Sequence, residues 1–384
     1  MQTEAVTMKS LEEVAFVIDR THYTPKYQND GIPCVSTANF TESGIDLSSC
    51  KKISEEDFKN ESERCNPEDG DILFSRIGTI GETRWAPPGK FLPLHSLVLI
   101  KPYRDQIEPK YLYYYLKSPT LLRQAHKGVQ SISVPDLGIK LIKKFSVPIP
   151  PREQQQKIAL ILEKAEQAKE LRKKADELTN ELLKAAFSEI ISSSNKSTRQ
   201  SKNAKLGDVA DILMGQSPNG ESYNNLAKGM PLLNGPTEFG IKHPTEKQWT
   251  TSPMKIAPKG SILFCVRGAT AGRMNWAEKE YCIGRGLAAI NSKTDLSNRF
   301  IFEFLRTKYD YFQNIGQGST FINLSRESIA NLLIPYPDKS MMNKFVDIAN
   351  RVEEIRDSQR DLGKHIDNFF DSSIQRAFNG ELVC

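Results

Sequence analysis

The strongest constraint on the fold of this chain is an internal repeat. Residues 70–78 match residues 260–268, and residues 146–150 match residues 333–337. A long helical pattern follows the second match in each copy. Self-similarity on this scale indicates that one structural unit occurs twice. The sequence therefore predicts two copies of a unit that has a globular part and a helix.

The two long helical patterns cover residues 153–191 and 339–378. Their apolar residues recur with heptad spacing, which is the pattern of a coiled-coil seam. Gln359 is the one polar residue in the second seam, where such a residue sets the register at some cost in stability. We expect the two helices to pair with each other. Separate helical hairpins, or seams between two copies of the chain, are the alternatives.

Changes in composition divide the chain into five segments. We expect a globular part over residues 1–150, a helix over 151–192, a polar linker over 193–204, a second globular part over 205–337 and a second helix over 338–384. Short apolar runs among Pro and Gly predict strands, and a helix is expected near residues 110–124 and near residues 298–313. The predicted fold class is α+β, with two similar globular domains.

Composition excludes several classes of protein. The 384 residues carry a net charge of +5, and no apolar run is long enough to span a membrane. The N-terminal segment has acidic residues where a secretory signal needs basic and then apolar ones, so we expect a cytoplasmic protein. The six cysteines have no C-x-x-C spacing, which argues against a zinc site or a redox pair. The mild positive charge is compatible with a nucleic-acid partner.

Motifs for catalysis are missing from the sequence. It has no histidine pair with metal-ligand spacing, no G-x-x-x-x-G-K-[ST] loop and no adenine-methyltransferase signature. Residues 284–289 imitate a G-x-G-x-x-A loop, but no helical pattern of adequate length follows them. A turn that leads into a strand is the better interpretation of these residues. We therefore expect a non-catalytic chain without a metal site.

Two glycine loops at matching places have the chemistry of a binding site. Residues 75–81 and residues 266–272 each join a strand to a turn that contains an arginine, a threonine and two glycines. Glycine allows close backbone approach, and arginine can hold a phosphate or form two hydrogen bonds with a guanine edge. We expect Arg76 and Arg267 to contact DNA.

A second pair of loops, at residues 127–131 and 316–320, offers lysine, glutamine and hydroxyl groups suited to phosphates and base edges. The candidate DNA-binding residues are Arg76, Thr79, Arg84, Lys127, Gln130, Ser131, Gln216, Arg267, Thr270, Arg273, Gln317, Ser319 and Thr320. The alternative is that these residues only form tight turns, in which Gly, Ser and Thr are common without any ligand.

The order of globular part, long helix, globular part and long helix resembles the specificity (S) subunit of type I restriction-modification systems. The resemblance is carried by Val147-Pro148-Ile149-Pro150-Pro151 with residues 153–158, by residues 206–210 with residues 215–218, and by residues 377–382. It covers essentially the whole chain. The second copy departs from the first at residues 338–342, which lack the glutamine run, and the first departs at residues 19–22.

The resemblance implies a function and a set of partners. Each globular part would be a target recognition domain that reads one half of a split site in double-stranded DNA, with the helices paired antiparallel as a spacer. Two modification subunits, which bind S-adenosylmethionine and methylate adenine, would dock on the helices and domains. ATP-driven restriction subunits would join them, and this chain itself would bind no cofactor. A coiled-coil scaffold whose globular parts bind protein or glycan is the alternative function.

Overall fold

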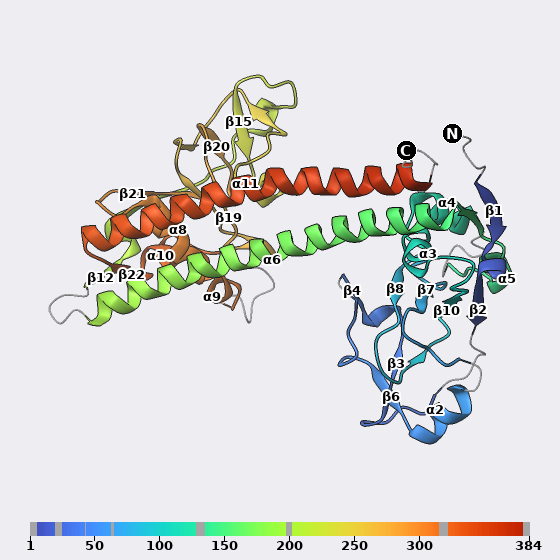
Figure 1. The fold of residues 1–384 in the computed structure, drawn as a ribbon. Helices are drawn as coiled ribbons and strands as arrows, with labels where there is room; N and C mark the ends of the chain where they lie inside the picture. Colours follow the sequence, from blue (N-terminus) through green and yellow to red (C-terminus); the bar gives the residue numbers. More distant parts are fainter. Residues whose placement is uncertain are drawn as a thin grey trace. The chain divides into compact units, whose positions relative to one another are not determined.

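The computed structural model divides the chain into two compact units. It describes residues 6–19, 25–42, 44–62, 65–127, 135–196, 202–314 and 322–378. The first unit joins Met1–Lys173 to Arg360–Cys384, and the second is Lys174–Gln359. Two long helices, α6 (Arg152–Lys196) and α11 (Lys339–Phe378), each contribute to both units (Figure 1). The first unit therefore contains both the beginning and the end of the chain.

A four-stranded antiparallel sheet forms the centre of the first unit. Its strand order is β2 (Ala15–Asp19), β10 (Leu97–Pro102), β7 (Ile72–Ser75) and β8 (Thr83–Trp85). Successive side chains of a strand point to opposite faces, so Ile72 and Phe74 enter one apolar cluster and Leu73 enters another. The sheet is therefore covered on both faces, which explains the apolar run in β7.

The second unit contains the same sheet. Its strand order is β13 (Ala210–Met214), β21 (Leu287–Ser292), β18 (Ile262–Cys265) and β19 (Met274–Trp276), again all antiparallel. Ile262 and Phe264 enter one apolar cluster, and Leu263 and Cys265 enter the other. The repeat in the sequence is thus a repeat of the central sheet and of its two cores.

Shorter elements complete the globular domain of each unit. In the first they are β1 (Thr7–Ser10) paired with β11 (Ser146–Ile149), α1 (Leu11–Val14), β3 (Ile32–Val35) between β6 (Lys51–Ile53) and β9 (Leu92–Pro93), β4 (Phe40–Thr41) with β5 (Gly44–Ile45), α2 (Glu55–Ser62) and α5 (Ile139–Lys143). In the second they are β12 (Lys202–Lys205) paired with β22 (Leu333–Tyr336), α7 (Leu206–Val209), a sheet of β14 (Tyr223–Asn224), β16 (Trp249–Thr250), β15 (Met230–Leu233), β20 (Tyr281–Ile283) and β17 (Ile256–Ala257), and α10 (Arg326–Ala330).

The single helix expected near residues 110–124 is wrong, because the structure has two helices there. They are α3 (Pro109–Leu116) and α4 (Pro119–Lys127). The Ser118 hydroxyl accepts a hydrogen bond from the backbone N–H of Leu121 at 3.2 Å, and Pro119 fits the first position of the new helix. In the second domain the expected helix is likewise divided, into α8 (Asn298–Thr307) and α9 (Tyr309–Asn314).

The core of the first domain is completed by the beginning of α6 and the end of α11. Ile158 and Leu162 of α6 belong to the same apolar cluster as Phe378 of α11. The Phe378 ring lies 5.4 Å from the ring of Tyr111 and 5.1 Å from that of Tyr115, both in α3. Such tilted and edge-on contacts between aromatic rings add to the energy of burial.

The second domain is completed by the opposite ends of the same helices. Leu183 and Phe187 near the end of α6 share an apolar cluster with Phe345 near the start of α11. The Phe187 ring lies 5.1 Å from Phe300 of α8 and 5.5 Å from Phe345. Each long helix therefore begins in the core of one domain and ends in the core of the other.

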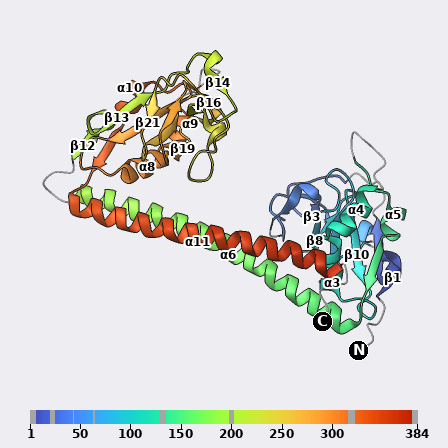
Figure 2. The same ribbon diagram turned by 90° about the horizontal axis from the view of Figure 1, so that it is seen from above.

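In each unit α6 and α11 pair as an antiparallel coiled coil (Figure 2). In the first unit Lys169 pairs with Asp367 at 3.2 Å. In the second, the Gln359 amide donates to the hydroxyl of Thr179 at 3.2 Å, so that the polar residue of the seam has a buried partner. The expected pairing of the two helices is confirmed.

Gly363 lies on α11 where Arg172 of α6 crosses it. A Cβ atom at this position would be 2.1 Å from the guanidinium carbon of Arg172. A side chain at this position would therefore require the Arg172 guanidinium to move. Among the described helices, none combines the length and the apolar character that a bilayer crossing requires.

Phe378→Ala should destabilise the first domain selectively. The variant removes a ring that is 8% exposed, and the expected cost is about 3 kcal/mol. Phe369→Ala is the control, since this side chain of the same helix is 55% exposed, and a change within about 0.5 kcal/mol is expected. Native-state hydrogen exchange in α3 and α8 reports on the two domains separately. An equal loss of protection in α8, or equal effects of the two variants, would contradict this assignment.

Candidate nucleic-acid interface

One end of the central sheet gathers the predicted binding residues of the second domain. In the ladder, Met214 lies opposite Ala288, Cys265 opposite Leu287, and Phe264 opposite Met274. The ends of β13 and β18 and the starts of β21 and β19 therefore share one edge. The loops at this edge contain Gln216, Arg267, Thr270, Arg273 and residues 284–286. We call this edge the loop end, and in the first domain the term means the corresponding ends of β2, β7, β10 and β8.

The opposite end of each sheet is connected to the long helices. In the second domain, α8 follows β21, and Arg299 of α8 pairs with Glu353 of α11 at 3.2 Å. In the first, α3 follows β10, and Lys110 pairs with Glu163 of α6 at 2.6 Å. The loop end is therefore the end of the sheet that these helix contacts leave open.

Aromatic stacking supports both helix contacts in the same way. Trp85 of β8 stacks on Tyr113 of α3, with ring centroids 4.3 Å apart, and Trp276 of β19 stacks on Phe302 of α8 at 4.7 Å. Because the same stack recurs at matching places, it belongs to the shared scaffold of the two domains.

The acidic groups at the second helix contact have shifted pKa values. Burial acts to raise the pKa of Glu353, but Lys242 and Arg299 offset this effect and hold the pKa below its usual range. For Glu303, burial outweighs the charges of Arg306 and Arg299, and the pKa is raised. Since Glu353 is charged more readily in the fold than in the unfolded chain, its contribution to stability is lost as the pH falls through the lowered pKa.

In both domains the glycine loop is hydrogen-bonded to the residues that follow the second loop. In the second domain the backbone N–H of Gly268 donates to Ile322 at 2.9 Å, and in the first the N–H of Gly78 donates to Pro135 at 2.9 Å. Both glycines have a positive φ, 75° for Gly268 and 77° for Gly78, which L side chains rarely adopt. In each domain the chain that directly follows the second loop therefore lies beside the glycine loop, while residues 128–134 and 315–321 are outside the described residues.

Arg76 and Arg267 do not occupy equivalent positions in these loops. The backbone N–H of Arg76 donates to the carbonyl of Ser96 at 2.9 Å. In the second domain the corresponding bond runs from the N–H of Val266 to the carbonyl of Gly286, also at 2.9 Å. Arg76 therefore corresponds to the buried Val266, and Arg267 is one position further along. The two arginines therefore lie one position apart in loops that otherwise match.

Arg76 is buried and fully engaged within the first domain. Its side chain pairs with Asp19 at 3.2 Å and with Asp136 at 2.9 Å, and its Nε donates to the carbonyl of Leu137 at 3.1 Å. The residue is 8% exposed. A contact between Arg76 and DNA would have to replace these bonds, so the arrangement gives Arg76 a structural role, and its DNA contact stays a prediction.

Arg267 and its neighbours are more accessible. Arg267 is exposed, and its Nε donates to Asn323 at 3.2 Å. Gln216 and Arg273 are also exposed, and Arg273 directly precedes β19. Among the residues that the structure describes, none pairs with the Arg273 side chain. The loop end of the second domain therefore presents exposed cations, Arg267 and Arg273 among them, and the amide group of Gln216.

The other candidates are distributed less favourably. Arg84 is half-buried, donates to the carbonyl of Thr41 at 2.8 Å and pairs with Glu82 at 3.1 Å. Thr79 is exposed, and Thr270 is half-buried, with its hydroxyl 3.6 Å from the Cys265 sulfur. Lys127 is exposed at the end of α4. Gln130, Ser131, Gln317, Ser319 and Thr320 lie outside the described residues.

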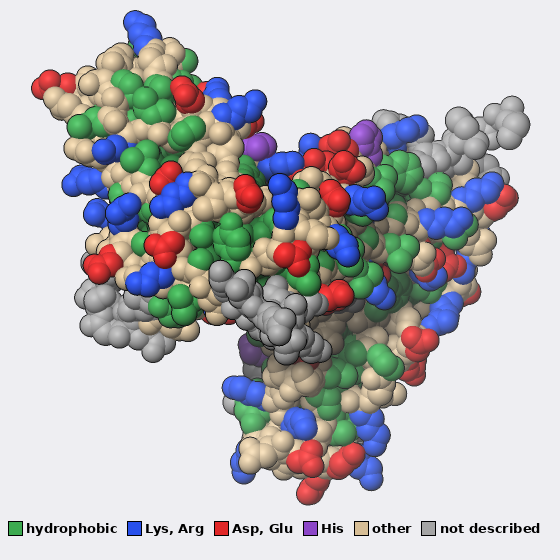
Figure 3. Space-filling model, turned by 90° about the vertical axis from the view of Figure 1, so that its left-hand side faces the viewer, with side chains coloured by type: hydrophobic (Ala, Val, Ile, Leu, Met, Phe, Trp, Pro, Cys, Tyr) green, Lys and Arg blue, Asp and Glu red, His purple; other side chains and the backbone are tan. Residues whose placement is uncertain are grey.

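Charge over the surface is mixed. Acidic and basic side chains are interspersed on the face displayed in Figure 3. The difference between the two loop ends is local: Arg76 and Arg84 are paired with carboxylates, whereas Arg267 and Arg273 are not paired with any described carboxylate. No cluster of three or more His, Cys, Asp or Glu residues among the described residues could hold a metal ion.

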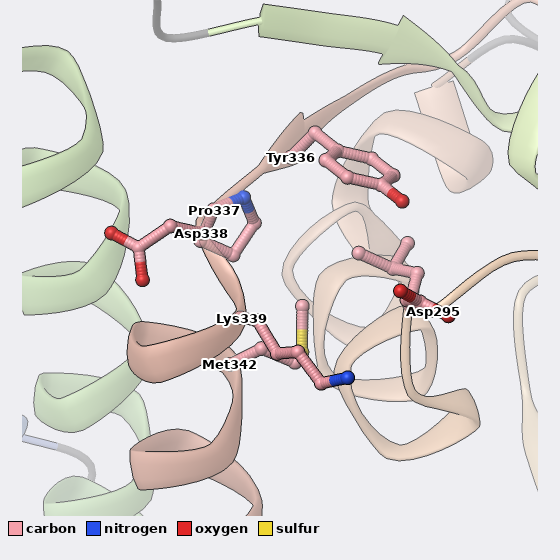
Figure 4. A pocket seen from close by; sticks show the side chains of 7 residues that line it. Asp295, Tyr336, Pro337, Asp338, Lys339 and Met342 are labelled. Carbon is pink, nitrogen blue, oxygen red and sulfur yellow. The ribbon is translucent and has the colours of Figure 1, made fainter.

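A pocket lies where α11 begins (Figure 4). It is lined by Asp295, Leu296, Tyr336, Pro337, Asp338, Lys339 and Met342. In the first domain the corresponding place holds Gln155, which accepts a hydrogen bond from the N–H of Glu108 and donates to the carbonyl of Pro150, both at 2.8 Å. Met342 cannot make these bonds. At residues 338–342 the second domain thus has a pocket lined in part by Met342, at the position where the first domain has a bridging glutamine.

Comparison with known proteins identifies relatives along nearly the whole chain. The profile of the family described as "Type I restriction modification DNA specificity domain" matches residues 4–180 and 199–362. A Methanocaldococcus jannaschii protein assigned as the type I restriction enzyme MjaX specificity subunit is 30% identical over 378 residues, which cover 91% of this chain and 86% of that protein.

Two solved structures share the fold. The S subunit of a type I restriction-modification system from M. genitalium superposes with a TM-score of 0.65 at 14% identity, covering 97% of this chain and 96% of that one. A chain from a study of assembly and conformational transition of the type I R-M system gives a TM-score of 0.61 at 23% identity and covers 98% of both chains.

Arg76→Ala and Arg267→Ala should affect stability differently. Removing Arg76 leaves the carboxylates of Asp19 and Asp136 without their partner, and a loss of about 2 kcal/mol is expected for the first domain. Removing the exposed Arg267 should change stability by less than about 0.5 kcal/mol. Denaturant unfolding followed by hydrogen exchange in each domain measures both values. If the Arg76 variant is as stable as the Arg267 variant, the ion pairs do not support the fold.

Proposed function

The chain belongs to the family of type I restriction-modification DNA specificity domains, and from this premise we propose that it recognises a two-part DNA site and docks the other subunits of the complex. It is the non-catalytic specificity subunit of such a system. In this proposal, each globular domain reads one half-site in double-stranded DNA. Because the proposed partner is DNA, we also propose that the chain acts in the cytoplasm.

The observation that carries the proposal is the duplicated loop end. Both domains have the same four-stranded sheet, with its faces buried and one end connected to the long helices. The other end carries a glycine loop beside the exit of a second loop, and in the second domain it presents Gln216, Arg267 and Arg273. Cationic groups supply affinity for phosphates, and amides and arginines can read base edges.

The helices suit the role of a spacer. α6 has 45 residues and is about 68 Å long at 1.5 Å per residue. Duplex DNA advances about 3.4 Å per base pair, so this length matches roughly 20 base pairs. Two half-sites separated by about one turn of the duplex fall within that length.

Exposed leucines on α6 support docking of the modification subunits on the helices. In the second unit Leu178 and Leu182 are 56% and 52% exposed, four residues apart on one face of the helix. On α11, Ile348 and Ile355 are exposed at heptad spacing. An apolar heptad row outside the seam is what a further helix needs in order to pack. We place S-adenosylmethionine on two modification subunits and ATP on the restriction subunits, with no cofactor on this chain.

Exchange of residues 205–337 for the matching domain of a relative should change one half-site only. Each domain has its own sheet and its own loop end, so the other half of the recognised sequence should stay as it was. Methylated adenines mapped across host DNA, with the modification subunits co-expressed, report both half-sites. A change in both halves would show that the domains do not read DNA independently, and absence of any sequence preference would favour a protein- or glycan-binding scaffold.

Replacing Leu178 and Leu182 by serine should weaken binding of the modification subunits. If both side chains are buried on docking, the loss of apolar contact costs about 2 kcal/mol, or roughly 30-fold in affinity. Serine at Glu177 and Glu181, which are exposed on the same helix with the same spacing, is the control. Titration of the purified subunits measures the affinities. Equal affinities for the two double variants would exclude this face from the contact.

A further inference from the structure

The turn at residues 284–286, between β20 and β21, lies at the loop end of the second domain. The sequence interpretation of these residues as a turn that leads into a strand is confirmed. The N–H of Gly284 donates to Leu233 at 2.8 Å, and the carbonyl of Gly286 accepts from the N–H of Val266 at 2.9 Å. The turn is thus fixed at both of its glycines by neighbouring strands.

Both glycines are required by close contacts with Asn234. A Cβ atom on Gly284 would lie 2.4 Å from the Asn234 side-chain oxygen, and one on Gly286 would lie 2.4 Å from the Asn234 carbonyl oxygen. The tip of the turn therefore carries a single side chain, that of Arg285. A tip with one side chain is narrow, and the major groove of B-DNA, about 12 Å wide, admits a two-stranded ribbon.

Arg285 is close in the fold to the other candidates of the loop end. The N–H of Gln216 donates to Ile283 at 2.9 Å, and the N–H of Arg285 lies 3.4 Å from the hydroxyl of Ser217. On the other side, the bond between Gly286 and Val266 sets the turn beside the residue that precedes Arg267. Arg285 is exposed, and no described side chain pairs with its guanidinium.

The first domain has the same turn with a different tip. The N–H of Leu94 donates to Val35 at 2.8 Å, as that of Gly284 does to Leu233, and Ser96 accepts from Arg76 as Gly286 accepts from Val266. The tip residue is His95, which is also exposed. A shared backbone geometry with a different side chain at its tip is the arrangement that a specificity position requires in a duplicated protein.

We propose that Arg285 reads a base of the second half-site, most simply a guanine. Arginine forms two hydrogen bonds with the O6 and N7 atoms of guanine in the major groove. The fixed turn holds the backbone of Arg285 in place before DNA binds, so little ordering is needed at that step. The inference rests on the proposed function of the chain and assigns one residue to its readout.

Three variants of the chain, each co-expressed with the modification subunits, test the proposal. Arg285→Ala removes both the charge and the paired N–H donors of the guanidinium. Arg285→Lys keeps the charge but removes the paired donors. Lys259→Ala is the control, since this exposed cation precedes β18 at the opposite end of the sheet. Methylated adenines in host DNA give the recognised sequence, and duplexes that carry this sequence, with single substitutions, give affinities at several salt concentrations.

The expected result is that Arg285→Ala and Arg285→Lys both lose discrimination at one position of the second half-site, by roughly tenfold or more, while Lys259→Ala keeps it. Arg285→Ala could instead weaken binding to all sequences equally and lower the slope of log affinity against log salt concentration by about one, with Arg285→Lys restoring both. That result would overturn the proposal and make Arg285 a phosphate contact. Unchanged specificity, or a change in the first half-site, would also overturn it. A wild-type complex without sequence preference would instead refute the proposed function.

Discussion

The structure depends on the burial of four helix ends. Phe378 enters the core of the first domain beside the start of α6, and Phe187 enters the core of the second beside the start of α11. Neither domain can therefore bury its apolar residues with its own sequence segment and the helix that follows it. Hydrophobic burial, which dominates the energetics of folding, ties the two halves of the chain together at both ends of the helix pair. The ion pairs of Lys110 and Arg299 with the long helices fix the same contacts from outside the cores.

This arrangement leaves one place on each sheet for recognition. Both faces of the sheet are covered by apolar clusters, and one end leads into the helices. At the remaining end, the two domains differ in whether their arginines are paired with carboxylates. Arg76 is neutralised by Asp19 and Asp136, whereas Arg267 and Arg273 are exposed. In the proposed function, a common scaffold with different loop chemistry would let one duplicated fold read two unlike sequences.

The sequence predicts the large-scale organisation well because the signals for it are local or periodic. The helical pattern over residues 339–378 has the same bounds as α11, and heptad spacing predicts that each long helix packs on a partner helix. The role of Arg76 was beyond sequence reasoning, because its partners are 57 and 60 residues away and depend on the fold. The division of the helix at Pro119 had a local signal that the apolar pattern obscured. Each domain core includes one end of both long helices, and neither copy of the repeat, taken alone, predicts this. Arg285 lies in the G-x-G-x-x-A-like segment that the sequence shows. Its position beside Gln216 and Val266 follows only from the register of the strands, which the sequence does not reveal.

The position of Phe378 also has a consequence for the order in which the protein folds during synthesis. The first domain is translated first, yet part of its core comes from Phe370, Ile374 and Phe378, near the end of the chain. The second domain needs only residues that precede Gln359, because the end of α6 and the start of α11 complete its core. On the ribosome, where domains generally fold as they emerge, the later domain can finish its core before the earlier one. Until the last turns of α11 are made, the ring faces of Tyr111 and Tyr115 have no aromatic partner from that helix, and a nascent chain exposes them to other contacts.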